Sequence, residues 1–352
     1  MRPYDAVLLV SFGGPEGPDD VMPFLENVTA GRGVPRERLV DVAEHYYHVG
    51  GVSPINGQNR ALLAALRDEL DAYGVGLPLY WGNRHWAPML PDVLAQMRDD
   101  GITNAIAFLT SAYASYSSCR QYLDAIERAR AEVGDGAPAV DRLRQYFNHP
   151  GFIEPMIGGV RAALQQLPAE YRDAAALAFV AHSIPSVMEA TSGPGGGAYT
   201  TQLAEAIRLV TEGVGGGHSA TLSFCSRSGS PSVPWLEPDI GDRLTELAKN
   251  GARAVVVVPI GFVSDHMEVV YDLDTEAAET AADLGLVFVR SATVGTAPPF
   301  VSMVRELVLE RMGEVPARAL GSLGSAQDRC PADCCRPRVD TPRGDTAAPR
   351  GR

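Results

Sequence analysis

The sequence predicts an α/β protein built from two similar lobes, each with a parallel sheet flanked by helices. Short apolar runs alternate with helical segments along the chain, which is the pattern of βαβ units. A buried-strand pattern that ends in a turn occurs at 5–15 and again at 176–185. A second repeated pattern, at 96–119 and at 246–268, consists of a helix end, a glycine, an apolar strand and a polar loop. Together the repeats predict that one folding unit is used twice.

The elements of the two lobes follow one another in the same order. In the first lobe, "DAVLLVSFGGP" provides the first strand, and apolar residues spaced by three and four predict a helix over 57–74. In the second lobe, "ALAFVAHSIP" provides the corresponding strand, and the same spacing predicts a helix over 199–215. We therefore divide the chain near "FNHPGF", with a first lobe over 1–147 and a second lobe over 148–297.

The C-terminal part differs in composition from the two lobes. "PPFVSMVRELVLERMG" predicts an apolar helix, and we expect the segment 298–318 to pack back on the body of the protein. Residues 319–352 are poor in large apolar side chains and rich in Gly, Pro, Arg and Asp, which predicts a polar tail. This tail contains three of the cysteines.

Composition excludes several functional classes. The 352 residues carry a formal net charge of -13 and no basic stripe, which argues against a nucleic-acid partner. The unbroken apolar stretch near the N-terminus is too short for a signal sequence or a transmembrane segment. Five cysteines, an odd number, do not resemble a secreted disulfide framework. These observations predict a cytoplasmic protein.

Polar segments follow several of the predicted strands. Sheets of this type bind ligands at the carboxyl ends of their strands. If the two lobes face each other, we expect the cleft between them to receive Ser11, His85, Tyr113 and His182. Such a lining would be reactive.

An acidic row follows the most apolar run of the chain, "ARAVVVVPIGFV". Glu268, Asp272 and Glu276 recur at every fourth position, so a helix would place them on one face. The row is either a solvated helix face or a line of hard oxygen donors that relays divalent cations. Its start at the end of a strand, directly after Asp265 and His266, favours the relay.

His182 terminates the strand "ALAFVAH". A single histidine at this position could be structural. In the predicted sheet, however, its neighbour is Glu268, and a histidine beside a carboxylate is a candidate acid/base or metal donor.

Three cysteines crowd into "RCPADCCRPR" near the C-terminus, namely Cys330, Cys334 and Cys335. A zinc site or an iron-sulfur cluster would need a fourth ligand from elsewhere. Reduced thiols in a disordered tail are the alternative.

Five segments of the chain resemble the ferrochelatases, lyases that insert ferrous iron into a porphyrin. They are "LLVSFGGPE", "GGVSPINGQ", "VAHSIP", "PWLEPDI" and "PIGFVSDHMEVVYDLDTEA", and they occur in the family's order. The resemblance runs from Tyr4 to about Gly313. It implies two Rossmann-like, chelatase-type lobes around a porphyrin cleft, in agreement with the duplication described above.

The resemblance assigns roles to the histidine and the acidic row. His182 and Glu268 match the family's catalytic cleft pair, and Asp272 and Glu276 match an acidic line on a π-type helix that guides metal to that pair. A porphyrin loses two pyrrole protons when a metal enters, so the reaction needs a base, and an imidazole with a reference pKa of about 6.5 is suited. Whether His182 accepts protons or delivers metal stays open.

The resemblance also implies substrate contacts. Phe12, Tyr46, Ser53 and Tyr122 match residues that bind the ring. The absence of a membrane anchor favours coproporphyrin III, a tetracarboxylate, with protoporphyrin IX as the alternative. The chain departs from some relatives at Thr29 and His45, where they have Arg, and at Phe12, where they have a Tyr that ligates product iron.

Some ferrochelatases carry a [2Fe-2S] cluster, and the resemblance implies one here. Its ligands would be Cys330, Cys334, Cys335 and a body cysteine, for which Cys119 is chosen over Cys225. The other expected partners are the porphyrin, ferrous iron and, transiently, neighbouring enzymes of haem synthesis.

Two other functions compete with iron insertion. A chelatase of the same fold could insert cobalt or nickel, but such relatives use paired histidines, whereas this chain offers His182 with Glu268. A non-catalytic haem or metal carrier would have no need for that pair.

Overall fold

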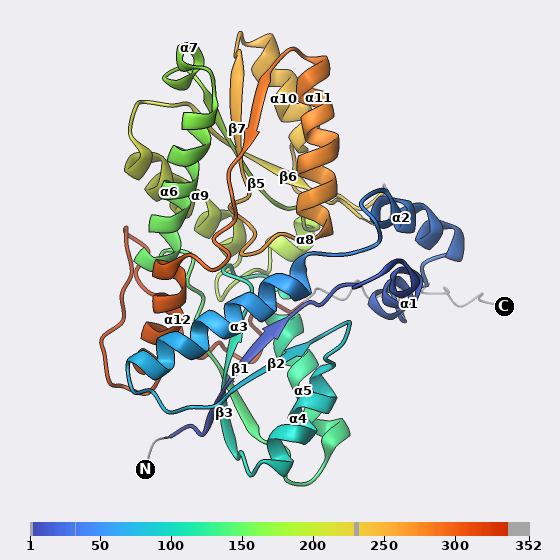
Figure 1. The fold of residues 1–352 in the computed structure, drawn as a ribbon, viewed down its shortest axis with the longest axis vertical. Helices are drawn as coiled ribbons and strands as arrows, with labels where there is room; N and C mark the ends of the chain where they lie inside the picture. Colours follow the sequence, from blue (N-terminus) through green and yellow to red (C-terminus); the bar gives the residue numbers. More distant parts are fainter. Residues whose placement is uncertain (1–2, 32, 229–231, 337–352) are drawn as a thin grey trace, which may run out of the picture.

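A computed structural model describes residues 3–31, 33–228 and 232–336 of the chain. Residues 337–352 of the predicted polar tail therefore lie outside the described residues, whereas all five cysteines lie within them. The chain forms two parallel sheets covered by helices (Figure 1).

The two sheets have the same strand order and the same direction. The first sheet has the order β2-β1-β3-β4 and the second has the order β6-β5-β7-β8. The strands of the first are β1 (Ala6–Ser11), β2 (Leu79–Asn83), β3 (Asn104–Leu109) and β4 (Ala139–Arg142). Those of the second are β5 (Ala176–His182), β6 (Ala220–Cys225), β7 (Ala254–Val258) and β8 (Val287–Arg290). The predicted duplicated α/β fold is confirmed.

Helices connect the strands in both lobes. The first lobe contains α1 (Pro18–Val28), α2 (Arg36–His48), α3 (Ile55–Ala72), α4 (Leu90–Asp99) and α5 (Gln121–Val133). The second contains α6 (Pro150–Gln166), α7 (Ala169–Arg172), α8 (Ser186–Glu189), α9 (Ala198–Val214), α10 (Ile240–Lys249) and α11 (Ala278–Asp283). Each lobe also has a π-helix after its third strand, η1 (Tyr116–Arg120) and η2 (Val269–Ala277).

Burial explains why the central strands are apolar throughout. Every residue of β1 and of β7 is buried, because helices cover both faces of each sheet. Strands buried on both faces form nearly continuous apolar runs rather than alternating ones. The paired residues Val7 and Ile106 on neighbouring strands both lie in the core.

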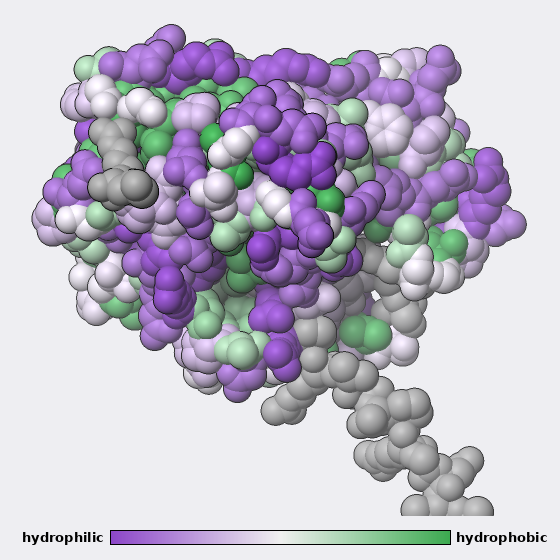
Figure 2. Space-filling model, turned by 90° about the horizontal axis from the view of Figure 1, so that it is seen from below, coloured by the Kyte–Doolittle hydropathy of each residue, from purple (hydrophilic) through white to green (hydrophobic). Residues whose placement is uncertain are grey.

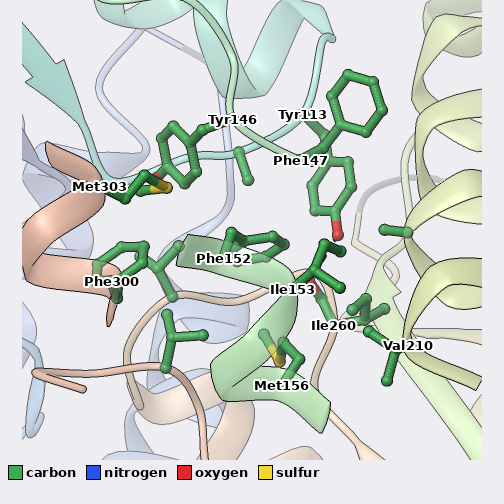
Figure 3. Close-up of a cluster of buried hydrophobic side chains, with 14 of the residues drawn as sticks. Tyr113, Tyr146, Phe147, Phe152, Ile153, Met156, Val210, Ile260, Phe300 and Met303 are labelled. Atoms are coloured by element: carbon green, nitrogen blue, oxygen red, sulfur yellow. Dashed lines mark hydrogen bonds between the residues drawn. The ribbon is translucent and has the colours of Figure 1, made fainter. Parts of the chain in front are cut away.

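One apolar core extends through both lobes. It includes Phe108 and Tyr146 from the first lobe and Phe152 from α6. Figure 3 shows Tyr146 and Phe152 in one cluster with Phe300. Tyr113 adds a polar link, because its hydroxyl donates a hydrogen bond of 2.9 Å to the carbonyl of Ile260 in the second lobe. The shared core holds the carboxyl ends of the two sheets near each other.

The last helix, α12 (Pro298–Arg311), lies between the lobes. It packs against α6 of the second lobe and α3 of the first. Arg305 of α12 pairs with Glu69 of α3 at 2.8 Å. The helix therefore fastens the second lobe to the first.

Helices α1 and α2 form a separate small apolar cluster with residues such as Phe24 and Leu39. They project to one side of the first sheet (Figure 1). In the part of the chain that the structure describes, no helix is long and apolar enough to span a membrane. Hydrophilic residues cover most of the face shown in Figure 2.

Candidate functional site

His182 is the last residue of β5, and its backbone is fixed from two sides. The hydroxyl of Tyr199 donates a hydrogen bond of 2.9 Å to the carbonyl of His182. The next residue, Ser183, donates its hydroxyl to the carbonyl of Leu236 at 2.8 Å. Nδ1 of His182 is close to the carbonyl of Ser183, which leaves Nε2 as the outward-facing nitrogen. The strand end therefore presents one imidazole nitrogen in a defined position.

The loop after β7 brings Glu268 to this nitrogen. Nε2 of His182 lies 3.4 Å from Oε1 of Glu268, and both side chains are partly exposed, at 36% and 43%. The loop can approach β5 because Gly261 has no side chain; a Cβ there would lie 2.7 Å from the Cα of Ala181. The predicted neighbourhood of His182 and Glu268 thus matches the geometry.

The two groups form an ion pair. Burial opposes the charge on His182, but the carboxylate of Glu268 outweighs it and raises the pKa of the imidazole to about 9. Burial would likewise raise the pKa of Glu268, but His182 outweighs it and lowers that pKa. The ion pair therefore favours the imidazolium form of His182, whereas a reference pKa near 6.5 suggests a neutral base.

A second histidine, His266, also lies close to Glu268. Nε2 of His266 is 4.0 Å from Oε2 of Glu268, and Nδ1 of His266 accepts a hydrogen bond of 3.1 Å from the backbone N–H of Glu268. Burial lowers the pKa of His266, which favours the neutral ring. The two carboxylate oxygens of Glu268 thus lie within 4.0 Å of two imidazoles, Oε1 near His182 and Oε2 near His266.

The acidic row continues from Glu268 along η2. Its π-helical character agrees with the implied π-type helix, and Thr275 donates its hydroxyl to the carbonyl of Val270, five residues earlier. Ser226, at the end of β6 and with a φ of 60°, donates a hydrogen bond to Asp272. Burial, with Glu268 and Glu276 nearby, raises the pKa of Asp272 to about 7.

The outer end of the row meets the first lobe. His45 of α2 stacks on Tyr271 of η2, with ring centroids 3.9 Å apart and planes inclined by 9°. Burial raises the pKa of Glu276, while the charge of His45 opposes that shift. Helix α2 and the π-helix thus contact each other directly.

The four predicted ring contacts lie in the first lobe, and they differ in exposure. Phe12 and Tyr46 are half-buried, whereas Ser53 and Tyr122 are only 5% and 6% exposed. Burial, with the charges of Glu268 and Asp272, raises the pKa of Tyr46.

Arg84 is a candidate that sequence reasoning passed over. It follows β2, and its guanidinium carbon lies 5.6 Å from the ring centroid of Phe12 and 4.6 Å from that of Tyr122. Its Nη2 donates to Oε1 of Gln121 at 3.1 Å. The segment "NRHW" at the end of a strand was the available signal, but only the fold places its arginine between two predicted ring contacts.

Two residues expected to line the cleft are buried instead. Tyr113 is 2% exposed and packs in the shared core. Ser11 is fully buried and accepts a hydrogen bond of 2.9 Å from Asn59. The expectation was wrong for both, because a polar residue at a strand end also serves to satisfy buried neighbours.

The tail cysteines lie against Cys119 on η1. The sulfur of Cys335 is 3.9 Å from that of Cys119 and 3.6 Å from that of Cys334. Cys330 packs against the same group. Cys225 lies elsewhere, at the end of β6 in the second lobe.

The structure does not present a formed metal site. Across 3–31, 33–228 and 232–336, no group of three or more His, Cys, Asp or Glu residues is arranged to hold a metal ion.

Comparison with known proteins adds independent information. The family model described as "Ferrochelatase" matches residues 4–312. A coproporphyrin III ferrochelatase of Streptomyces coelicolor is 55% identical, over 97% of this chain and 95% of its own. One of Nocardia farcinica with the same description is 53% identical, over 95% and 97%. The SirB structure from Bacillus subtilis with Fe3+ has a TM-score of 0.55 at 13% identity, covers 88% of this chain and 97% of its own, and shows a shared fold.

Proposed function

The chain belongs to the ferrochelatase family, and from that premise we propose that it inserts ferrous iron into coproporphyrin III to give coprohaem. It is a metal chelatase, a lyase. The observation that carries the mechanism is the contact of 3.4 Å between His182 and Glu268 at the carboxyl end of β5. Both the proton and the metal chemistry can take place there.

Iron insertion releases two protons from the porphyrin nitrogens, and His182 is the group we assign to receive them. In the substrate-free protein its Nε2 faces Glu268. A ferrous ion that takes the Glu268 carboxylate as a ligand displaces the imidazolium from it. His182 can then pass its proton to solvent, accept the first pyrrole proton, release that proton to solvent and accept the second.

The acidic row supplies oxygen ligands on the way to this point. Asp272 and Glu276 follow Glu268 along η2, and Ser226 orients the carboxylate of Asp272 by a hydrogen bond. Carboxylate oxygens exchange with water on a divalent ion, so the row lets iron lose its water in steps. We infer that metal enters from the Glu276 end and reaches the porphyrin at Glu268.

Two lines of support favour coproporphyrin III over protoporphyrin IX. The relatives from Streptomyces and Nocardia are described as coproporphyrin III ferrochelatases, at 55% and 53% identity. In addition, Arg84 lies between Phe12 and Tyr122, two of the predicted ring contacts. A guanidinium is suited to bind a carboxylate in a bidentate manner, and coproporphyrin carries more carboxylates than protoporphyrin.

We also propose that Cys119, Cys330, Cys334 and Cys335 hold a [2Fe-2S] cluster. Four cysteine sulfurs are the usual donor set for such a cluster, and these four lie in one group. Cys225 packs in a different cluster of the second lobe, which favours Cys119 as the fourth ligand. When bound, the cluster would supply one-electron redox chemistry, and the insertion of ferrous iron does not require it.

An anaerobic insertion assay with coproporphyrin III and protoporphyrin IX side by side tests the proposed function. The change in the visible bands follows metal entry into either ring. We expect faster turnover of coproporphyrin III, with Co2+ and Ni2+ inserted more slowly than ferrous iron. Preference for protoporphyrin IX would overturn the substrate assignment. If neither ring takes up iron, the assignment as a chelatase is overturned and a non-catalytic haem or metal carrier is favoured.

A further inference from the structure

Arg142, the last residue of β4, is a buried cation that donates hydrogen bonds to three uncharged oxygen acceptors and one sulfur. The residue is 5% exposed. Nη1 donates to the carbonyl of Leu143 at 3.0 Å and to the side chain of Gln145 at 3.3 Å. Nη2 donates to the carbonyl of Gln327 at 3.3 Å and to the sulfur of Cys330 at 2.9 Å. The guanidinium thus joins the body of the first lobe to the tail.

The neighbouring arginines have carboxylate partners, and Arg142 does not. Arg144, 2% exposed at its side chain, pairs with Glu310 at 2.6 Å. Arg120, which contacts the same tail segment through the carbonyl of Ala332, pairs with Asp124 at 2.9 Å. Among the described residues, no carboxylate lies within the 4.0 Å ion-pair distance of the Arg142 guanidinium. A buried charge without a counter-charge is costly, so an anion bound beside Arg142 would be stabilised there.

The sulfur group is the natural position for that anion. Besides Cys330, the sulfur of Cys335 accepts a hydrogen bond of 3.0 Å from the backbone N–H of Gly193. Two of the sulfurs thus accept hydrogen bonds from the body of the protein. The donor to Cys330 belongs to the first lobe, and the donor to Cys335 belongs to the second. Thiol sulfurs are weak acceptors, whereas metal-bound thiolates are strong ones. In a [2Fe-2S] cluster, four thiolates and two sulfides outweigh two ferric ions, so the whole group is an anion.

We propose that Arg142 is the counter-charge of the [2Fe-2S] cluster, and that its hydrogen bond to Cys330 both retains the cluster and raises its reduction potential. The proposal rests on the cluster assigned above. Reduction adds an electron to a group that is already negative, so a buried cation and an N–H···S hydrogen bond favour the reduced form. Arg142 acts through the ligand sulfur and is a positioning residue.

The test uses the full chain, reconstituted anaerobically with iron and sulfide, and compares Arg142→Gln and Arg142→Lys with the parent. Arg120→Gln is the matched control, because Arg120 holds the same tail segment but donates to a carbonyl. Visible circular dichroism reports cluster content, a spectroelectrochemical titration gives the midpoint potential, and a chelator gives the rate of cluster loss. We expect Arg142→Gln to shift the potential to more negative values and to lose its cluster several-fold faster. Arg142→Lys should lie between Arg142→Gln and the parent.

Each outcome decides the proposal. An Arg142→Gln protein with the potential and lifetime of the parent cluster overturns it. So does an Arg120→Gln protein that loses its cluster as fast as Arg142→Gln, because tail docking alone would then explain the effect. If Arg142→Gln takes up no cluster while Arg142→Lys and Arg120→Gln do, the charge requirement is supported. A parent protein that binds no iron and sulfide overturns the cluster assignment itself, while iron insertion into coproporphyrin is judged separately by the turnover assay.

Discussion

The two lobes share a strand order but carry different side chains after their strands. In the first lobe, β1 is followed by Phe12 and β2 by Arg84, an aromatic ring and a cation in contact. In the second lobe, β5 ends in His182 and the segment after β7 supplies Glu268, an ion pair. In the function proposed above, the first lobe holds the carboxylated ring and the second handles protons and metal.

The same contrast holds for the two π-helices. Each follows the third strand of its sheet, but η1 carries Cys119, whereas η2 begins after Glu268 and carries Asp272. π-Helices are often found at functional sites, because they re-aim side chains relative to an ordinary helix. The comparison teaches that the same scaffold can carry different chemistry, because the chemistry depends on the residues that follow the strands.

Removing the His182–Glu268 ion pair should have the largest effect on the rate of iron insertion. We expect His182→Ala and Glu268→Gln each to lower kcat for iron insertion by about 100-fold or more, the scale of a lost acid/base group. Binding of coproporphyrin, measured by the quenching of protein fluorescence, should persist because the proposed ring contacts lie in the first lobe. Turnover close to that of the parent in His182→Ala would refute the role of the second lobe.

Replacing the first-lobe cation should affect binding rather than chemistry. We expect Arg84→Gln to raise KM for coproporphyrin III by about 10-fold or more, because a hydrogen bond to a charged group contributes about 1.5–3 kcal/mol. The change in kcat should be small. Arg60→Gln is the matched control, since Arg60 also lies over an aromatic ring, Trp81, at 5.6 Å but pairs with Glu16. Equal effects of the two substitutions would mean that Arg84 does not contact the ring.

Titration of His182 sharpens the description of the second lobe. Nuclear magnetic resonance of the imidazole should give a pKa near 9 in the parent protein. The pKa should be lower in Glu268→Gln, because the carboxylate that outweighs the effect of burial is then absent. A raised folded-state pKa stabilises the protein below the unfolded value of about 6.5. This stabilisation is lost as the pH rises through about 9. An unchanged pKa in Glu268→Gln would contradict the ion pair.

The close approach of the β7 loop to β5 can be tested at Gly261. A Cβ at this position would lie 2.7 Å from the Cα of Ala181, one residue before His182. We expect Gly261→Ala to lower the free energy of unfolding by about 1–3 kcal/mol, as overpacking does. The control Gly158→Ala, in α6 with open space around it, should be neutral or stabilising. Thermal unfolding of the two variants gives the comparison.

The smallest effect is expected where the two lobes touch at the outer end of the acidic row. His45 and Tyr271 stack at 3.9 Å, and such a pair contributes about 0.5–1.5 kcal/mol beyond burial. A double-mutant cycle with His45→Ala and Tyr271→Ala in urea unfolding measures this coupling. A coupling of zero would show that the contact does not hold the lobes together.

Much of the site could be predicted because its signals are local in the sequence. Glu268, Asp272 and Glu276 share one segment, and His182 ends a strand whose partner strand is equally evident. What could not be predicted is which polar strand-end residues face the site. Tyr113 and Ser11 turned inward, since a buried carbonyl or amide needed their hydrogen-bonding atoms.

The sequence by itself determined the duplicated α/β fold, the family and the acidic row, because periodicity and motif order are properties of neighbouring residues. Only the tertiary structure decided which groups share an electrostatic environment. It placed Glu268 against His182, and this contact raises the pKa of the imidazole above its reference value. It also placed Arg142 against Cys330, 188 positions away in the chain. Charge interactions depend on distance and burial in three dimensions, and neither is written in the local sequence.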